Sequence, residues 1–193
     1  MKPEQVQKIE IDCLSAYMFI NFRQALGFGH ITWGFEVAPG EYFYGSNDHL
    51  LRRPMWDLIA LAKYSSVAPG DDTDYWSGHG SLSDMLAEMS QGPHIWYHAY
   101  KKLTVPATSA DPTSARLLAE GLKDQGWRLW DNNCVHQTHR VLKTFGAGDQ
   151  MIQIGQVSKY NRPWQAPTPV KFFEQAQGSA SELERKVTVR SCR

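Results

Sequence analysis

The sequence predicts an α+β domain in which a small antiparallel sheet packs against helices. Alternating apolar residues over 31–37 and an aromatic run over 41–44 indicate a β-hairpin. Apolar stripes over 114–125 and 135–145 indicate two amphipathic helices later in the chain. The chain has 193 residues, of which 42% are apolar, so it can close one sizeable core and one domain is expected.

The first element, from Pro3 to Leu26, is predicted to be a helix because its apolar residues recur at helical spacing. Gly27 and Gly29 follow as helix stoppers. Its most apolar part, 11–22, contains polar residues and falls short of the about 18 uninterrupted apolar residues that a membrane span needs. We therefore expect an amphipathic core helix and no transmembrane segment.

The predicted hairpin begins at His30. From Ile31 to Val37 every second residue is apolar, which places His30 on the opposite face, near the start of the first strand. The turn Ala38-Pro39-Gly40 leads into a second, aromatic strand, Glu41-Tyr42-Phe43-Tyr44.

The middle of the chain is harder to interpret. Clusters of Gly, Asp and Ser interrupt short helical patterns over 50–93, which indicates two short helices and a long irregular loop. The segment Trp76-Ser77-Gly78-His79-Gly80 is expected in that loop, either covering an active site or forming a surface turn. A strand is predicted from Ile95 to Val105.

Two helices follow. Leu117, Leu118 and Leu122 form one stripe over 114–125, and Asp111-Pro112 provides a cap and a first-turn proline. A second helix is predicted from Val135 to Phe145, ended by Gly146-Ala147-Gly148.

We therefore expect one catalytic domain over 1–165, with an insertion at about 50–93 and a partly flexible C-terminal extension over 166–193. Residues 151–157 are a candidate for one further strand. Twenty basic and twenty acidic residues balance, so no nucleic-acid partner is indicated. The N-terminus lacks a signal-peptide pattern, which favours a cytoplasmic protein as synthesised and leaves signal-independent secretion open.

The three cysteines, an odd and sparse set, are typical of free thiols in a reducing compartment. Cys13 is expected to be a small core residue, and Cys192 lies next to the chain end. Cys134 ends a polar loop and opens the helix predicted after it. The unpaired N–H groups and the dipole at a helix start favour thiolate over thiol and can receive an oxyanion. With His30 as the base, Cys134 is thus a candidate nucleophile.

Two blocks of the chain resemble a known family. They comprise Gly29-His30-Ile31-Thr32 with Glu41-Tyr42-Phe43-Tyr44-Gly45-Ser46, and Leu103-Thr104-Val105, the helix over 114–125, Trp127-Arg128-Leu129 and Asn133-Cys134 with Val141-Leu142 and Gly146. Their order and spacing resemble the PPPDE peptidases, the circularly permuted papain-like group that includes the desumoylating isopeptidases. In this group and in the related acyltransferase-like and permuted cell-wall-amidase enzymes, the histidine precedes the cysteine, as it does here.

The resemblance implies a circularly permuted papain-like fold in which Cys134 is the nucleophile and His30 the base. Asn133 matches the residue that commonly precedes the nucleophile and could help to polarise the scissile carbonyl. Asn47 and Asp48 are candidates to orient the imidazole, although a simple dyad is equally allowed. The insertion at 50–93 has no counterpart in the family, so substrate specificity is not carried over.

No metal or cofactor is expected. His136 and His139 with Cys134 superficially resemble a metal cluster, but residues 134 and 136 point about 200° apart on a helix. His94 and His98 lie in the approach to a predicted strand and do not form a convincing site either.

The predicted activity is that of a cysteine peptidase or amidase, a thiol hydrolase acting on a peptide-like substrate such as an isopeptide or a cell-wall peptide. One alternative is a thiol acyltransferase or lipid hydrolase, favoured if Trp56, Leu58, Ile59 and Leu61 form an apolar channel to Cys134. Another is a catalytically silent peptide-binding module. The sequence names no inhibitor or immunity partner.

Overall fold

The computed structural model describes residues 13–49, 66–70, 73–92, 96–129, 131–152 and 167–183. Over these residues the chain forms an α+β domain built on a six-stranded antiparallel sheet with strand order β5-β3-β2-β1-β6-β8. The strands are β1 (Cys13–Asn21), β2 (His30–Ala38), β3 (Glu41–His49), β5 (Thr73–Ser81), β6 (Ala99–Pro106) and β8 (Ala180–Glu182). The predicted fold class, α+β, is confirmed.

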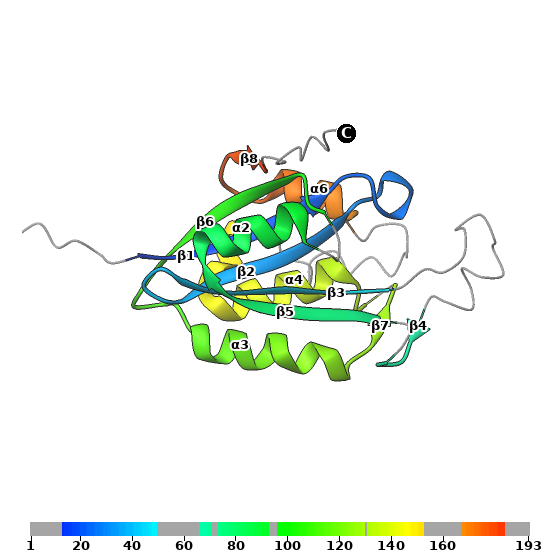
Figure 1. The fold of residues 1–193 in the computed structure, drawn as a ribbon, viewed down its shortest axis with the longest axis horizontal. Coiled ribbons are helices and arrows are strands. Elements are labelled where there is room, and N and C mark those ends of the chain that lie inside the picture. Colours follow the sequence, from blue (N-terminus) through cyan, green and yellow to red (C-terminus); the bar gives the residue numbers. More distant parts are fainter. Residues whose placement is uncertain are drawn as a thin grey trace, which may run out of the picture.

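Helices cover both faces of the sheet. The helices are α2 (Leu82–Gln91), α3 (Pro112–Glu120), α4 (Cys134–Leu142) and α6 (Pro169–Gln175). In Figure 1, α2 lies in front of the strands and α4 behind them. A smaller core contains residues of α2 with Tyr17, Phe19 and Tyr44, and a larger core contains residues of α3, α4 and α6 with Trp33 and Phe35. The sheet is therefore buried on both faces.

The N-terminal helix prediction is wrong, because residues 13–21 form the strand β1. Met18 and Ile20 face the larger core, and Tyr17 and Phe19 face the smaller one. A strand buried on both faces is apolar at every position, so its sequence has no period of two and resembles a buried helix. Cys13, expected in the core, is exposed at the start of β1.

The predicted hairpin is confirmed. Strands β2 and β3 pair in antiparallel fashion, with Trp33 opposite Gly45 and Phe35 opposite Phe43. The turn between them contains Gly40 at a φ of +76°, a left-handed conformation that favours glycine. Strand β3 continues to residue 49, five residues beyond the aromatic run, and this extension brings polar residues alongside the start of β2.

The segment 76–80, predicted as loop, is instead the middle of strand β5, which pairs with β3 along its whole length. The loop prediction for this segment is wrong because it rested on glycines, which are frequent in loops but also occur in strands. A Cβ at Gly78 would lie 2.5 Å from the Tyr44 ring, so this glycine marks close packing rather than a turn. Helix α2 follows directly and begins with a reciprocal capping box between Ser81 and Asp84.

The later elements agree with the sequence pattern up to residue 150. The predicted strand 95–105 corresponds to β6, and the two predicted helices correspond to α3, which continues as a short 3-10 segment (Gly121–Asp124), and to α4. The candidate strand 151–157 lies almost entirely outside the described residues.

The range expected as a C-terminal extension contains α6 and β8. Phe172 and Phe173 of α6 are buried in the larger core, and β8 pairs with β6. Lys101, itself buried, donates to the carbonyl oxygens of Glu174 and Ala176 at 3.1 and 2.6 Å, beside the end of α6. Residues 167–183 thus belong to the fold, which the loose composition of this segment did not indicate.

Candidate active site

His30, the first residue of β2, holds its ring through both nitrogens. Nε2 lies 2.8 Å from Oγ of Ser46, and Nδ1 lies 3.4 Å from Oδ2 of Asp48. All three residues are buried, and His30 is 1% exposed. Nδ1–H donates to the ionised Asp48 carboxylate. Nε2 accepts the hydroxyl proton of Ser46 when the imidazole is neutral and donates to Ser46 Oγ when it is protonated, so the two contacts hold the orientation of the ring in either form.

Strand periodicity explains why Asp48, and not Asn47, meets the imidazole. Successive side chains of a strand point to opposite faces, so Ser46 and Asp48 share one face of β3 and Asn47 lies on the other. The Asn47 amide donates to the carbonyl oxygens of Leu122 and Gly126 at 3.2 and 3.3 Å. The structure therefore does not bring Asn47 to His30. The Asn47 amide instead stabilises the segment between α3 and α4.

The loop between β1 and β2 also contributes to the surroundings of Asp48. Asn21 Oδ1 accepts from the backbone N–H groups of Arg23 and Gln24 at 2.8 and 3.2 Å. The Gln24 side chain in turn donates to Asp48 Oδ2. Sequence reasoning did not single out Gln24 or Ser46; a polar run at the end of an aromatic strand, Ser46-Asn47-Asp48, was the available signal for Ser46.

The pKa of His30 is set by burial, which is the largest single influence, and by several opposing interactions that together exceed it. Burial disfavours the imidazolium and by itself lowers the pKa of His30. Opposing it, the charges of Asp48, Tyr97 and Cys134 together with the hydrogen bond to Asp48 raise the pKa of His30 well above its ordinary value. The histidine is therefore protonated over a wider pH range than a free imidazole, with the carboxylate as its counter-ion.

Cys134 is the first residue of α4 and is 7% exposed. Helix α4 packs on β2, where Thr138 Oγ1 lies 3.4 Å from the carbonyl oxygen of Ile31. The Cys134 side chain packs in the larger core, whereas the His30 ring lies 5.9 Å, between ring centroids, from Tyr97 of the smaller core. The two candidate residues interact electrostatically, and in the described part of the chain no hydrogen bond joins them.

Asn133 forms the N-cap of α4. Its Oδ1 accepts from the backbone N–H groups of Val135 and His136 at 2.9 and 3.3 Å, and its Nδ2 donates to the carbonyl oxygen of Leu129 at 2.7 Å. Both ends of the amide are thus engaged in the start of the helix. The N–H of Cys134, which has no acceptor within the helix, is left as the nearest backbone donor for an oxyanion.

On α4, His136 is half-buried and His139 is buried. Burial lowers the pKa of His136, and burial with the nearby Lys143 charge lowers the pKa of His139 to about 4. His139 lies edge-on to Phe172 of α6, with 6.0 Å between ring centroids. His139 is therefore neutral at physiological pH and packs as a core residue.

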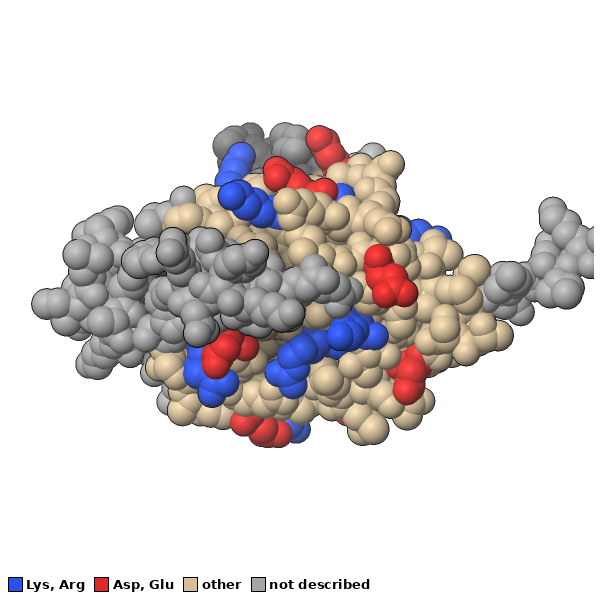
Figure 2. Space-filling view, turned by 180° about the vertical axis from the view of Figure 1, so that it is seen from behind, with Lys and Arg blue, Asp and Glu red and all other residues tan. Residues whose placement is uncertain are grey.

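The surface in Figure 2 carries acidic and basic side chains interspersed, without a large patch of one sign among the described residues of that face. No helix in the described ranges combines the length and the apolar character required to span a bilayer.

Comparison with protein-family models, with curated proteins and with solved structures found no match to this chain.

Proposed function

We propose that this chain is a cysteine hydrolase that cleaves an amide or peptide bond, with Cys134 as nucleophile and His30 as base. The proposal rests on one observation. The imidazole of His30 on β2 is buried and held by Asp48, and the helix that begins at Cys134 packs on the same strand as His30. The order of histidine before cysteine, with the strand and helix that bear them, also supports a circularly permuted papain-like fold related to the PPPDE peptidases.

In the proposed reaction, the neutral form of His30 takes the proton of the Cys134 thiol. The raised pKa of His30 favours the resulting thiolate–imidazolium pair, and the thiolate attacks the carbonyl carbon of the substrate. The resulting oxyanion accepts a hydrogen bond from the Cys134 N–H. His30, now an imidazolium stabilised by Asp48, protonates the leaving amine as the carbon–nitrogen bond breaks and a thioester forms. A water molecule deprotonated by His30 then cleaves the thioester and releases the acid.

This sequence of steps has a structural requirement. The resting hydrogen bond of Nε2 goes to Ser46, and the His30 ring lies beside Tyr97 of the smaller core, whereas Cys134 packs in the larger core. The imidazole therefore has to exchange Ser46 for the thiol and turn toward the larger core before the proton moves. Catalytic hydrogen bonds often form only when the substrate is bound. The role of Asp48 is unaffected, because a carboxylate on Nδ1 favours the imidazolium whichever group Nε2 faces.

A second candidate function follows from a specific observation at the same histidine. Ser46, His30 and Asp48 have the connectivity of a serine-hydrolase triad, with the nucleophile–base distance at 2.8 Å and the base–acid distance at 3.4 Å. In this alternative Ser46 Oγ attacks the carbonyl. Ser46 is 1% exposed and Cys134 is 7% exposed, so Cys134 is the more accessible of the two nucleophiles and the serine hydrolase is the second choice.

Two covalent probes separate the candidates. Iodoacetamide labels thiols, and a fluorophosphonate labels an activated serine; peptide mass spectrometry then gives the labelling rate at each residue. The exposed Cys13 serves as the ordinary thiol of the same molecule. We expect the buried Cys134 to react faster than Cys13 in the wild type and to lose this advantage in His30→Ala.

Labelling of Ser46 by the fluorophosphonate, abolished by Ser46→Ala and His30→Ala, would instead establish the serine hydrolase. If Cys134 reacts no faster than Cys13 and Ser46 is not labelled, both proposals fail and a catalytically silent peptide-binding module takes their place. The residues Trp56, Leu58, Ile59 and Leu61, whose arrangement as an apolar channel would favour a thiol acyltransferase or lipid hydrolase, lie outside the described residues.

A further inference from the structure

Within the described residues, the sheet ends on β5 at one side and on β8 at the other. An edge strand exposes unpaired backbone groups, which proteins commonly protect by a short strand, a proline, a lysine or a bulge. Strand β8 is short, with three residues. Strand β5 has nine residues, contains neither proline nor lysine, and pairs with β3 without a shift of register. It therefore lacks each of these protections.

Hydrogen bonds at the two ends of β5 show which of its backbone groups point away from β3. In an antiparallel pair, alternate residues exchange both backbone hydrogen bonds with the partner strand, and the residues between them point outward. The N–H of Thr73 donates to the carbonyl oxygen of Gly70 at 3.0 Å instead of to β3. The N–H of Ser81 donates to the Asp84 carboxylate at 2.9 Å. The residues of β5 in the same alternation also point outward, and they are Tyr75, Ser77 and His79.

We call the backbone N–H and C=O groups of these three residues the β5 edge. Within the described part of the chain these groups form no hydrogen bond. Ser77 and His79 are exposed, and Tyr75 is half-buried. Alternating donors and acceptors in one row are what a further β-strand requires for pairing.

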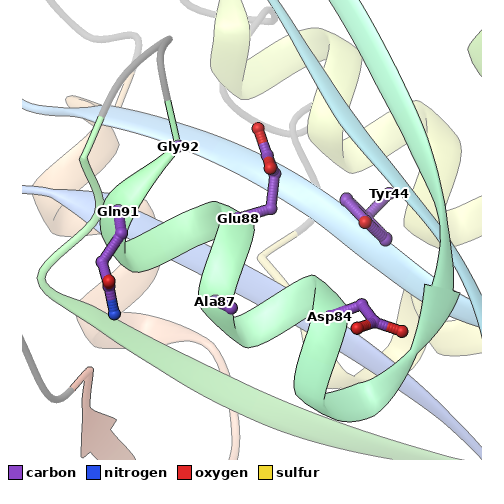
Figure 3. Close-up of a pocket in the computed structure, with 6 residues that line it drawn as sticks. All are labelled: Tyr44, Asp84, Ala87, Glu88, Gln91 and Gly92. Atoms are coloured by element: carbon purple, nitrogen blue, oxygen red, sulfur yellow. The ribbon is translucent and has the colours of Figure 1, made fainter. Parts of the chain in front are cut away.

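Carboxylates flank the β5 edge on the face of the sheet that α2 covers. The Asp84 side chain lies against Gly80 of β5, where a Cβ would come within 3.0 Å of its Oδ2. Hydrogen bonds with Ser81 lower the pKa of Asp84, so this carboxylate is charged. Burial, and then the charges of Glu88 and Asp84, raise the pKa of Tyr44, whose ring lies over β5. Figure 3 shows both carboxylates on the same side of α2 as Tyr44.

The opposite face of β5 is also close to carboxylates. Burial is the main cause that raises the pKa of Tyr75, and the charges of Glu120 and Asp124 add to it. Arg116 pairs with Glu120 at 2.9 Å and neutralises it. In the described ranges Asp124, Asp84 and Glu88 form no ion pair. Uncompensated negative charge thus lies on both sides of the β5 edge.

We propose that an extended peptide with basic side chains binds to β5 as an additional strand. The peptide backbone would pair with the β5 edge. Because successive side chains of a strand point to opposite faces, lysine or arginine residues of the peptide would reach Asp84 and Glu88 on one face and Asp124 on the other. This inference concerns binding alone and does not depend on the proposed hydrolysis.

A second copy of this chain fits the β5 edge less well. Two copies joined through β5 by a two-fold axis present the same patch to each other. The Asp84 and Glu88 carboxylates of the two copies would then approach one another, and like charges across an interface are unfavourable. A partner of opposite charge avoids this repulsion.

The first measurement is amide hydrogen exchange of the full chain, labelled with ¹⁵N, at low ionic strength. Without peptide, the amides of Tyr75, Ser77 and His79 should exchange freely, whereas those of Trp76 and Gly78, which face β3, should be protected. The probe is the peptide acetyl-Lys-Thr-Val-Lys-Val-Thr-Lys-amide, which carries lysine on both faces of a strand. At a peptide concentration of about ten times Kd, exchange of the three outward amides should slow by about tenfold.

Two control peptides separate the backbone contribution from the charge contribution. A copy methylated on its three central backbone nitrogens keeps the lysines but lacks donors on both of its edges, and it should not protect the β5 edge. A copy with glutamate in place of lysine should bind more weakly than the lysine peptide.

Variants of the protein test the same two contributions. Glu88→Gln and Asp124→Asn should each weaken binding by about twofold to fivefold, as for loss of an exposed ion pair. The matched control Glu174→Gln removes a carboxylate from α6 and should leave binding unchanged. Ser77→Pro removes the central outward N–H and should weaken binding by about tenfold. Its control is Ala180→Pro at the start of β8, and the amide spectrum first establishes that both proline variants are folded.

Three results would overturn the proposal: protection of the outward amides before peptide is added, equal binding of the glutamate peptide, or equal protection by the methylated peptide. In the first case, sedimentation equilibrium identifies what covers the edge. A monomer would indicate another segment of the same chain, and a dimer would indicate a second copy.

Discussion

Asp48 and His30 form a buried acid–base couple, with 3.4 Å between Oδ2 and Nδ1. The two residues lie on the neighbouring strands β2 and β3, and Gln24, in the loop that precedes β2, donates a hydrogen bond to the Asp48 carboxylate. A buried charge is tolerated when it is paired and hydrogen-bonded. Breaking the couple therefore has consequences both for the charge of His30 and for the stability of the fold.

The first prediction concerns the charge of His30. In Asp48→Asn the ring stays buried but loses the carboxylate, so burial dominates and the pKa of His30 should fall below that of the wild type. An NMR titration of the His30 ring measures this. Asp124→Asn, an exposed carboxylate at the end of the α3 segment, is the matched control and should leave the titration unchanged. An unchanged pKa in Asp48→Asn would contradict the assigned couple.

The second prediction is the pH dependence of stability. Because the pKa of His30 is raised in the folded state, protons bind more tightly there than in the unfolded chain. This contribution is fully present below the unfolded value of about 6.5, and it is lost as the pH rises from there through the folded pKa. The free energy of unfolding of the wild type minus that of His30→Gln should therefore decrease above pH of about 6.5.

Urea unfolding at closely spaced pH values measures this difference, and its slope should not exceed about 1.4 kcal/mol per pH unit for a single proton. A difference that grows with rising pH would mean that the folded state favours neutral His30, the opposite of what the Asp48 contact implies.

Asn47 gives a third prediction, which separates it from its neighbour. Its amide donates to two carbonyl oxygens, of Leu122 and Gly126. Asn47→Ala leaves these acceptors without that donor and should cost about 1–3 kcal/mol in the free energy of unfolding. The pKa of His30 should stay at its wild-type value, since Asn47 lies on the other face of β3. A shift as large as that in Asp48→Asn would restore Asn47 as an orienting residue.

The contrast between Asn47 and Asp48 shows which features of the candidate site could be predicted from the sequence and which could not. Alternation correctly placed His30 opposite the apolar face of its strand, and the helix start at Cys134 could be read from the polar loop and the apolar stripe that follows. The length of β3 was not visible, because Ser46-Asn47-Asp48 is polar and strands are expected to be apolar or alternating. Without that length, the face shared by Ser46, Asp48 and His30 could not be inferred.

Strand β1 was missed for a different reason. Its residues are buried by two cores, and only the tertiary structure distinguishes such a strand from a buried helix. Likewise, nothing local distinguishes the glycines of β5 from those of a loop. The ring of Tyr44, 34 residues away, explains Gly78.

A fourth prediction tests that explanation. In Gly78→Ala the new Cβ would lie 2.5 Å from the Tyr44 ring, so the ring or the strand has to move, at a cost of about 1–3 kcal/mol. Gly121→Ala, where the nearest atom is the flexible Gln125 side chain at 4.0 Å, is the matched control and should be neutral or slightly stabilising. Thermal unfolding of both variants measures the difference; equal effects would remove the packing argument.

The last prediction separates the capping role of Asn133 from a catalytic one. Its Oδ1 accepts from the N–H groups of Val135 and His136, so Asn133→Ala should lower the free energy of unfolding by about 1 kcal/mol. Asn133→Asp keeps the accepting oxygen and should retain most of the stability. If the amide serves only the helix start, the labelling rate of Cys134 by iodoacetamide in folded protein should follow the integrity of the cap. Asn133→Asp should then resemble the wild type in stability and differ in labelling only through its added charge.

A catalytic amide would behave differently. Polarisation of a carbonyl requires the Nδ2 donor, which Asn133→Asp lacks, so turnover of an amide substrate would fall by about 100-fold or more in that variant, as for loss of an oxyanion-hole donor, while stability stayed near wild type. Since Nδ2 donates to the carbonyl oxygen of Leu129 at 2.7 Å, we expect only a small effect on turnover. The backbone N–H of Cys134, which no side-chain substitution removes, is the donor left to stabilise the oxyanion.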